Sequence, residues 1–208
     1  MSANGKEITG KKNETAPSFH DGTLANTFVT IKIGRKRRKF QVHKHLICFY
    51  SPYFDAAFNG TFKEGEVGAL ELAKVTKSSF RSFLDWLYFG RLPEYILYHD
   101  ESGDDQSIGK KETGEDGGNP YYPMSAYKLY VFADRYNVPE LRKDLMEVIR
   151  SVWKAEGEYY PSNEETTWLF NALPESSALC TFMVDLYAYR FEPTWDNDVE
   201  IKARSQPP

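Results

Sequence analysis

The sequence contains little cysteine and no long hydrophobic run, and each absence excludes a class of protein. Its 208 residues include two cysteines, Cys48 and Cys180, which form no Cys-x-x-Cys pair. A disulfide framework is therefore excluded, and two reduced, buried thiols are typical of an intracellular protein. No apolar run approaches the roughly 20 residues that a membrane span needs, and the polar N-terminus lacks a secretory signal. We expect a soluble protein of the cytoplasm, the nucleus or both, without membrane contact.

A strong net charge and the common catalytic motifs are also absent. The net charge of −4 is mild, so no overall field favours nucleic acid or an anionic membrane. The sequence has no GxSxG, no HExxH, no GxxxxGK[ST] and no GxGxxG after a strand. We therefore expect no enzymatic activity and no cofactor. The chain is 41% hydrophobic and 15% aromatic, which is enough to build a core.

Two histidines and a cysteine, His43, His45 and Cys48, lie within six residues and raise the question of a metal site. Zinc sites use four protein ligands, or three and a water molecule. The other histidines, His20 and His99, lie in segments that read as a tail and a loop. We interpret the three residues as structural, with the His43 ring hydrogen-bonding to backbone, and predict no metal.

Two polar segments divide the chain. Residues 1–26 are polar and aperiodic, and we expect a disordered tail. Residues 99–120 hold seven acidic residues, two lysines and one aliphatic residue, which indicates a disordered surface insert. We assign the main domain to residues 27–153, a helical extension to 154–193 and a second tail to 194–208.

Hydrophobic periodicity predicts an α+β fold with a small three-stranded sheet flanked by helices. Apolar residues alternate in 27–33, a basic turn follows, and a short strand and a third strand are expected at 40–42 and 68–72. Ser51 is expected to cap a helix that begins at Pro52. Further helical patterns occupy 43–50, 78–89, 124–137, 138–153, 166–173 and 179–187.

Five short motifs in order resemble the BTB/POZ domain, most closely that of the small fungal BTB proteins. They are Phe40-x-Val42-His43-Lys44-x-Leu46, Ser51-Pro52-x-Phe54, Phe62-x-Glu64, Trp86-Leu87-Tyr88-x-Gly90 and Ala133-Asp134-x-Tyr136-x-Val138-x-x-Leu141. The sequence departs from many members in having Asn26-Thr27 where they have Ser-Asp. It also shows no amphipathic helix in residues 1–26, so we expect a monomer or a weak dimer rather than a swapped dimer.

The resemblance implies a non-enzymatic protein–protein interaction module that acts as a scaffold or binding protein. So small a domain cannot bury all its aromatic residues, and exposed aromatics and methionine favour a protein interface. The residues that we predict to contact a partner, which includes a self-association partner, are Phe54, Phe58, Phe62, Met124, Tyr127 and Tyr130.

An alternative that the resemblance implies is a substrate adaptor of a cullin-3 ubiquitin ligase. Such adaptors bind the cullin through a loop that often carries a hydrophobic residue, any residue, and then Glu or Asp. We align this loop with Met124-Ser125-Ala126-Tyr127, where Ala126 stands at the acidic position. The adaptor role is therefore the second hypothesis.

Five consecutive basic residues form the predicted turn between the first two strands: Arg35, Lys36, Arg37, Arg38 and Lys39. They suit nuclear import or a phosphate contact, and a nuclear or transcription-associated BTB protein is a further alternative. They also suit a solvated hairpin tip that protects a sheet edge from aggregation. We favour the hairpin tip, because five charges give little affinity for nucleic acid at physiological salt.

Overall fold

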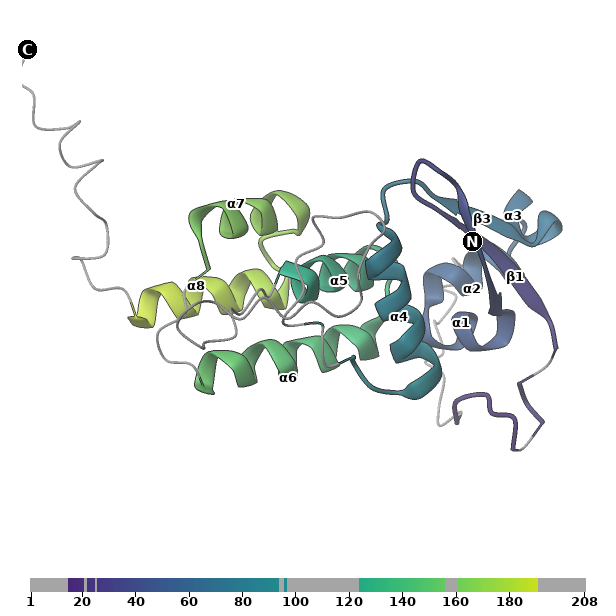
Figure 1. The fold of residues 1–208 in the computed structure, drawn as a ribbon, viewed down its shortest axis with the longest axis horizontal. Coiled ribbons are helices and arrows are strands. Elements are labelled where there is room, and N and C mark those ends of the chain that lie inside the picture. Colours follow the sequence, from purple (N-terminus) through teal and green to yellow (C-terminus); the bar gives the residue numbers. More distant parts are fainter. Residues whose placement is uncertain are drawn as a thin grey trace, which may run out of the picture. The chain divides into compact units, whose positions relative to one another are not determined.

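A computed structural model describes residues 15–20, 22–24, 26–93, 96, 124–155 and 161–190 (Figure 1). Contacts divide the chain into two compact units, Met1–Leu145 and Met146–Pro208, and each is described by itself. The predicted insert at 99–120 and the predicted tail at 194–208 lie outside the described residues. Among the described helices, none is both long and apolar enough to cross a bilayer.

The first unit contains a three-stranded sheet of β1 (Phe28–Ile33), β2 (Arg38–His43) and β3 (Ala69–Leu72). Strand β1 lies in the centre, antiparallel to β2 and parallel to β3. The alternation expected from the sequence is confirmed, because Val29, Ile31 and Ile33 are buried between less buried neighbours. The second strand begins two residues earlier than predicted, at Arg38, so two of the basic residues belong to the sheet.

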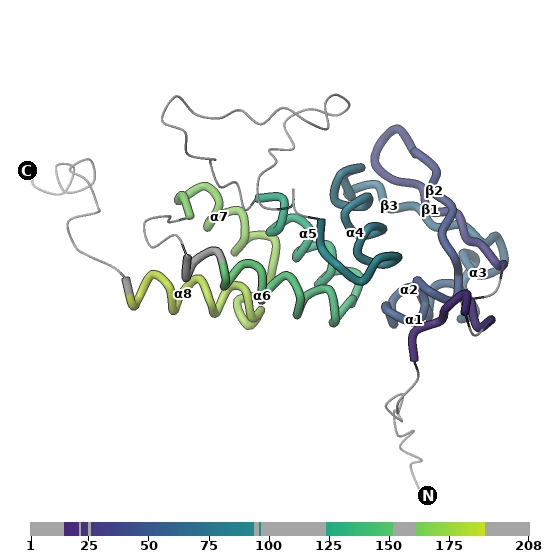
Figure 2. Tube along the Cα trace, turned by 60° about the horizontal axis from the view of Figure 1, so that its bottom comes forward, coloured from purple at the N-terminus to yellow at the C-terminus, as the bar shows by residue number. Residues whose placement is uncertain are grey.

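Helices cover one face of this sheet. In both Figure 1 and Figure 2, α1, α2 and α4 lie on the same side of β1. The helices are α1 (Lys44–Tyr50), α2 (Pro52–Asn59), α3 (Lys63–Val67), α4 (Lys77–Phe89), α5 (Met124–Arg135) and α6 (Pro139–Ala155). The sequence did not predict α3, because five residues are too few to show a helical period.

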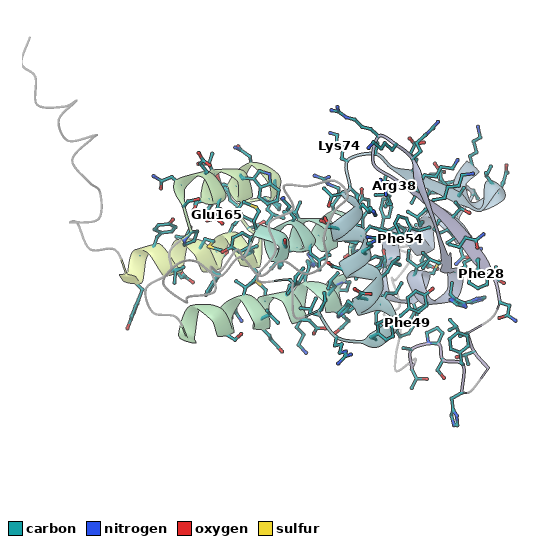
Figure 3. All side chains as sticks on the ribbon, viewed as in Figure 1. Phe28, Arg38, Phe49, Phe54, Lys74 and Glu165 are labelled. Atoms are coloured by element: carbon teal, nitrogen blue, oxygen red, sulfur yellow. The ribbon has the colours of Figure 1, made fainter. Side chains whose placement is uncertain are left out.

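Aromatic rings fill the space between the helices. Phe83 contacts Phe54 and Phe132 with centroid distances of 6.3 and 4.8 Å, and Phe132 contacts Tyr136 at 4.8 Å. Figure 3 shows Phe54 among these inward-pointing side chains. Each such ring buries about 150–250 Å² of surface, so this cluster contributes a substantial part of the apolar burial in the unit.

The second unit contains α7 (Asn163–Ala172) and α8 (Ala178–Arg190). The capping box predicted at Ser162 and Glu165 is present at the start of α7. The Tyr187 hydroxyl donates to the Pro161 carbonyl at 2.6 Å, which ties α8 to the residue before α7. The division at residue 146 falls inside α6, whereas the sequence placed a boundary at 153. A continuous helix gives no sequence signal of such a division.

Part of the predicted N-terminal tail makes ordered contacts. The Leu24 amide donates to the Ser18 carbonyl at 3.0 Å, and the Ser18 amide donates to Thr23 Oγ1 at 3.0 Å. The Leu24 side chain is buried, at 7% exposure. These contacts lie before residue 27, where the sequence analysis placed the start of the domain.

Ser51 joins the start of α2 to the end of α5. Its hydroxyl oxygen accepts from the Phe54 amide at 3.1 Å, as the sequence predicted for a helix cap. The same hydroxyl donates to the Tyr136 carbonyl at 2.6 Å, and the side chain is fully buried. One hydroxyl thus satisfies two buried backbone groups, and it joins Ser51 to a residue 85 positions later in the chain.

We predict that Ser51→Ala lowers the free energy of unfolding by about 2–3 kcal/mol, because both buried backbone groups lose their partner. Thr76→Ala is the matched control, since Thr76 Oγ1 caps α4 by accepting from the Ser79 amide at a more exposed position. That control should cost about 1 kcal/mol. Urea unfolding of the two variants provides the measurement, and equal costs would show that the bond to Tyr136 contributes nothing.

Candidate functional site

Most of the residues predicted to contact a partner are buried. The exposed fractions are 0% for Phe54 and Tyr127 and 2% for Phe58 and Tyr130. The expectation that these four side chains are exposed was wrong, because aromatic residues pack against one another in the core instead of reaching the surface. A partner could touch these four side chains only if the fold opened. Their burial therefore gives no support to the predicted role in binding.

The segment aligned with the cullin-binding loop is the first turn of helix α5. Met124 is partly exposed, whereas Ala126 and Tyr127 are fully buried. The third residue of this segment therefore faces the interior, where an acidic residue would be desolvated. The helical pattern expected from residue 124 is present, so the stretch aligned with that loop belongs to α5, and its apolar side chains pack inward.

Phe62 is the predicted contact residue that the structure exposes. It is 59% exposed and lies between α2 and α3, and Val67 at the end of α3 is 63% exposed. We call Phe62, Glu64 and Val67 the Phe62 corner. Its own turns are closed, because the Gly65 amide donates to the Phe62 carbonyl at 3.0 Å and the Gly68 amide to the Glu64 carbonyl at 2.9 Å. The Thr30 amide of β1 donates to the Gly68 carbonyl at 2.9 Å, which ties the corner to the sheet.

Close backbone packing fixes the position of this corner. A Cβ atom at Gly60 would lie 2.3 Å from the Ala56 carbonyl oxygen and 3.3 Å from the Phe62 ring. A Cβ atom at Gly65 would lie 3.1 Å from the Phe58 carbonyl oxygen. The two glycines therefore allow α3 to lie against the end of α2, which leaves the Phe62 side chain outside the core.

A second exposed aromatic surface surrounds His43. The His43 ring contacts Phe28 at 4.2 Å, Phe19 at 5.4 Å and Tyr88 at 5.7 Å between centroids. Phe19, Phe28 and Tyr88 are 70%, 47% and 38% exposed, whereas His43 is 9% exposed. We call these four residues the His43 cluster. The sequence analysis missed it, although the hairpin register, which sets Phe28 opposite His43, could have revealed one contact.

His43 is neutral in this setting. The Tyr88 hydroxyl oxygen accepts from the His43 backbone amide at 3.1 Å and lies 2.9 Å from the ring Nδ1. The tautomer of the ring decides which of the two atoms, Nδ1 or the Tyr88 hydroxyl oxygen, is the donor in this hydrogen bond. Burial lowers the pKa of His43 from its ordinary value, because the charged form loses hydration. The sequence placed the ring against backbone, whereas the structure gives it a side-chain partner.

The other members of the predicted structural group point elsewhere. His45 is exposed, and the thiol of the buried Cys48 lies 3.6 Å from the Phe54 carbonyl oxygen. In the described parts of the chain, no three His, Cys, Asp or Glu side chains gather in a way that could hold a metal ion.

The five basic residues do not form one uniform patch. Arg35, Lys36 and Arg37 lie in the turn, and Arg38 and Lys39 lie in β2. Arg37, with a backbone φ of 50°, reaches across to Glu71 on β3, where its Nε lies 2.9 Å from a carboxylate oxygen. This hydrogen bond raises the pKa of Arg37 and lowers the pKa of Glu71. The charge of Arg37 is thus offset by a neighbour that the sequence did not reveal.

Exposed aromatic residues on a rigid, packed α+β scaffold are the features of a protein-binding domain. Comparison with known proteins specifies the family. Residues 19–101 match the BTB/POZ domain, which is a protein–protein interaction module. This part of the chain is therefore a BTB/POZ domain, and the α+β BTB fold expected from the five motifs is confirmed.

One similar protein is the BTB and MATH domain-containing protein 15 of Caenorhabditis elegans, which is 30% identical over 82 residues. The aligned part covers 39% of this chain and 29% of that protein, so the chain spans less than a third of the curated relative. The BTB domain of zebrafish PATZ1 is 17% identical with a TM-score of 0.39, over 64% of this chain and 81% of that one. The expectation that the chain is most similar to small fungal BTB proteins is not supported by this relative, which is a nematode protein.

We predict that His43 makes the fold less stable in mild acid. Its folded-state pKa lies below the unfolded value of about 6.5, so the unfolded chain binds more protons between these two values. The stabilisation is complete above the unfolded pKa and is lost as the pH falls toward the folded pKa. His43→Gln should therefore flatten the dependence of unfolding free energy on pH between about 7.5 and 5.

The exposed His45 lies two residues away and supplies the control. Urea unfolding of His45→Gln should show the same dependence on pH as the unchanged protein. If His43→Gln also kept that slope, the neutral, buried state assigned to the His43 ring would be incorrect.

Proposed function

We propose that this chain is a non-enzymatic interaction protein that binds a partner protein at the Phe62 corner. The observation that carries the proposal is the exposure of Phe62 and Val67 on a segment held by backbone hydrogen bonds at both ends. A preorganised apolar side chain loses little conformational entropy when a partner covers it. Burial of one such aromatic residue in an interface is typical of an energetic hot spot.

Quantitative affinity capture tests this proposal, with Phe62→Asp as the variant. Phe89→Asp is the matched control, because Phe89 at the end of α4 is also an exposed phenylalanine, at 70% against 59% for Phe62. We expect partners that are retained by the unchanged protein and the control to lose at least about tenfold in recovery with Phe62→Asp. Equal recovery with both variants would refute the Phe62 corner as the docking surface.

A specific observation supports the cullin-3 adaptor as a second candidate function. The pattern of a hydrophobic residue, any residue and an acid, which Met124–Ala126 lacks, occurs at Phe62-Lys63-Glu64. There Phe62 is exposed and Glu64 is partly exposed, on the connection between α2 and β3. A cullin could therefore receive an apolar side chain and a carboxylate from the same short segment. This assignment moves the proposed contact from α5 to the Phe62 corner.

Calorimetric titration with the cullin-3 N-terminal domain from the same source separates the two assignments. If the Phe62 corner is the contact, Phe62→Asp should weaken binding about a hundredfold and Met124→Asp by less than about threefold. The opposite order would restore the assignment to α5. Absence of binding at tens of micromolar would remove the adaptor role and leave the general interaction module in place.

The cellular location of the protein is a further proposal. Cys48 and Cys180 are buried and form no disulfide, which supports a cytoplasmic or nuclear location. A nuclear or transcription-associated role would use the basic turn as an import signal. Membership of the small fungal group, self-association and the absence of enzymatic activity also remain proposals.

A further inference from the structure

We propose that the uncovered face of the three-stranded sheet binds an extended, acidic segment of a partner protein, separately from the Phe62 corner. Alternation assigns the side chains of this outer face. Val29, Ile31 and Ile33 point into the core, so Phe28, Thr30 and Lys32 of β1 point outward. The register places His43, Gln41 and Lys39 of β2 opposite them, and Ala69 and Glu71 of β3 beside Thr30 and Lys32.

One end of the outer face is strongly basic. Lys32 lies directly opposite Lys39, and the turn with Arg35, Lys36 and Arg37 follows at the same end. Residues 28–43 contain no acidic residue, and residues 69–75 contain one, Glu71. Lys74 adds a further charge at this end, because its neighbour Val75 lies close to Gly34 of the turn. The Val75 carbonyl oxygen is 3.6 Å from the position that a Cβ atom would take at Gly34. This basic end stands out in a chain with a net charge of −4.

Protection of the sheet edge explains only part of this charge. An exposed lysine on an edge strand prevents other chains from pairing with it, which accounts for Lys39 on β2. Lys32 lies on the central strand β1, where no edge needs protection. Two like charges directly opposite each other also destabilise a sheet. Glu71 on β3 lies beside Lys32 and offsets part of this repulsion. A bound carboxylate between the two ammonium groups would turn the rest into attraction.

The other end of the outer face is aromatic. Phe28 and His43 are opposite each other, and Phe28 remains 47% exposed beside Tyr88 and Phe19 of the His43 cluster. Figure 3 shows Phe28 and Arg38 at the two ends of the hairpin. Phe28 and Lys32 are four residues apart, so about 13 Å separates the aromatic end from the basic end. An extended partner segment spans this distance with side chains at its own positions i and i+4.

Charge complementarity therefore defines the occupant as an extended segment with an apolar anchor near one end and carboxylates near the other. An acidic protein segment fits better than nucleic acid for two reasons. The carboxylate of Glu71 is on the same face and would repel a continuous phosphate backbone. The aromatic end offers the Phe28 and Phe19 rings around the buried His43, which suit an apolar side chain better than a phosphate.

Fluorescence anisotropy with a defined probe tests the proposal on the full chain. The probe is a labelled peptide of about nine residues, with phenylalanine near one end, glutamates near the other and threonines between, and its reversed sequence tests the opposite direction. We expect saturable binding of one direction at about 10–100 μM in low salt. Lys32→Gln combined with Lys39→Gln should weaken it about tenfold, and Phe28→Ser about threefold to tenfold.

Glu71→Gln should strengthen the binding of the probe, in contrast to the lysine and Phe28 variants, which should weaken it. It removes the acid on the outer face and the partner of Arg37, so the probe should bind about threefold more tightly. Matched controls change the same charges on exposed helix positions: Arg81→Gln combined with Lys143→Gln, and Glu147→Gln. These controls should alter the affinity by less than about twofold.

Thermal unfolding excludes misfolding as the cause of weaker binding. Removal of the two opposed lysines should leave the midpoint unchanged or raise it, because a repulsive pair is lost. Phe62→Asp should leave the affinity for the probe unchanged, so failure of this proposal and failure of the Phe62 corner are distinguishable.

Three outcomes would overturn the proposal. The first is the absence of saturable binding of either peptide up to about 1 mM. The second is an equal loss of affinity in the lysine variant and in its matched control. The third is tighter binding of a single-stranded oligonucleotide of the same charge, which would identify a nucleic-acid surface instead.

Discussion

The register of the hairpin between β1 and β2 is the constraint on which the rest of this domain depends. With Val29 opposite Val42 and Ile31 opposite Phe40, these apolar side chains face the core, while Phe28 stays on the outer face. A slip by one residue would turn Lys32 inward and Ile31 outward, because the side-chain period of a strand is two residues. Burial of an unpaired lysine costs several kcal/mol, so the core and the outer face specify the same register.

Phe62 is exposed because the hydrophobic core ends at the C-terminal end of α2. Phe54 stacks on Phe83 and on Phe58 within the helical layer, and Phe58 is the last buried side chain of α2. The chain turns there at Gly60, where any side chain would strike the Ala56 carbonyl. The following phenylalanine, Phe62, is consequently directed to solvent. Aromatic content alone cannot distinguish Phe54 from Phe62, because the difference lies in backbone packing and not in residue type.

This difference explains how far the sequence could predict the structure. Strand alternation, the Ser51 cap and the Ser162–Glu165 capping box depend on neighbours in the chain, and the structure contains each of them. The burial of Tyr127, the contact of Arg37 with Glu71 and the hydrogen bond between His43 and Tyr88 depend on residues distant in sequence. No local pattern contains such contacts, so a list of exposed aromatics drawn from the sequence selected mostly core residues.

The Phe62 corner and the outer face of the sheet are linked by short backbone contacts. The Thr30 amide of β1 donates to the Gly68 carbonyl at 2.9 Å, immediately after α3. A Cβ atom at Gly65 of α3 would lie 3.1 Å from the Phe58 carbonyl oxygen of α2, so α3 packs against the end of α2 as well. Because packed elements move as rigid bodies, a ligand on the sheet and a partner at the corner would each find the other surface already formed. The two surfaces can thus be occupied together, which is the arrangement that a scaffold protein requires.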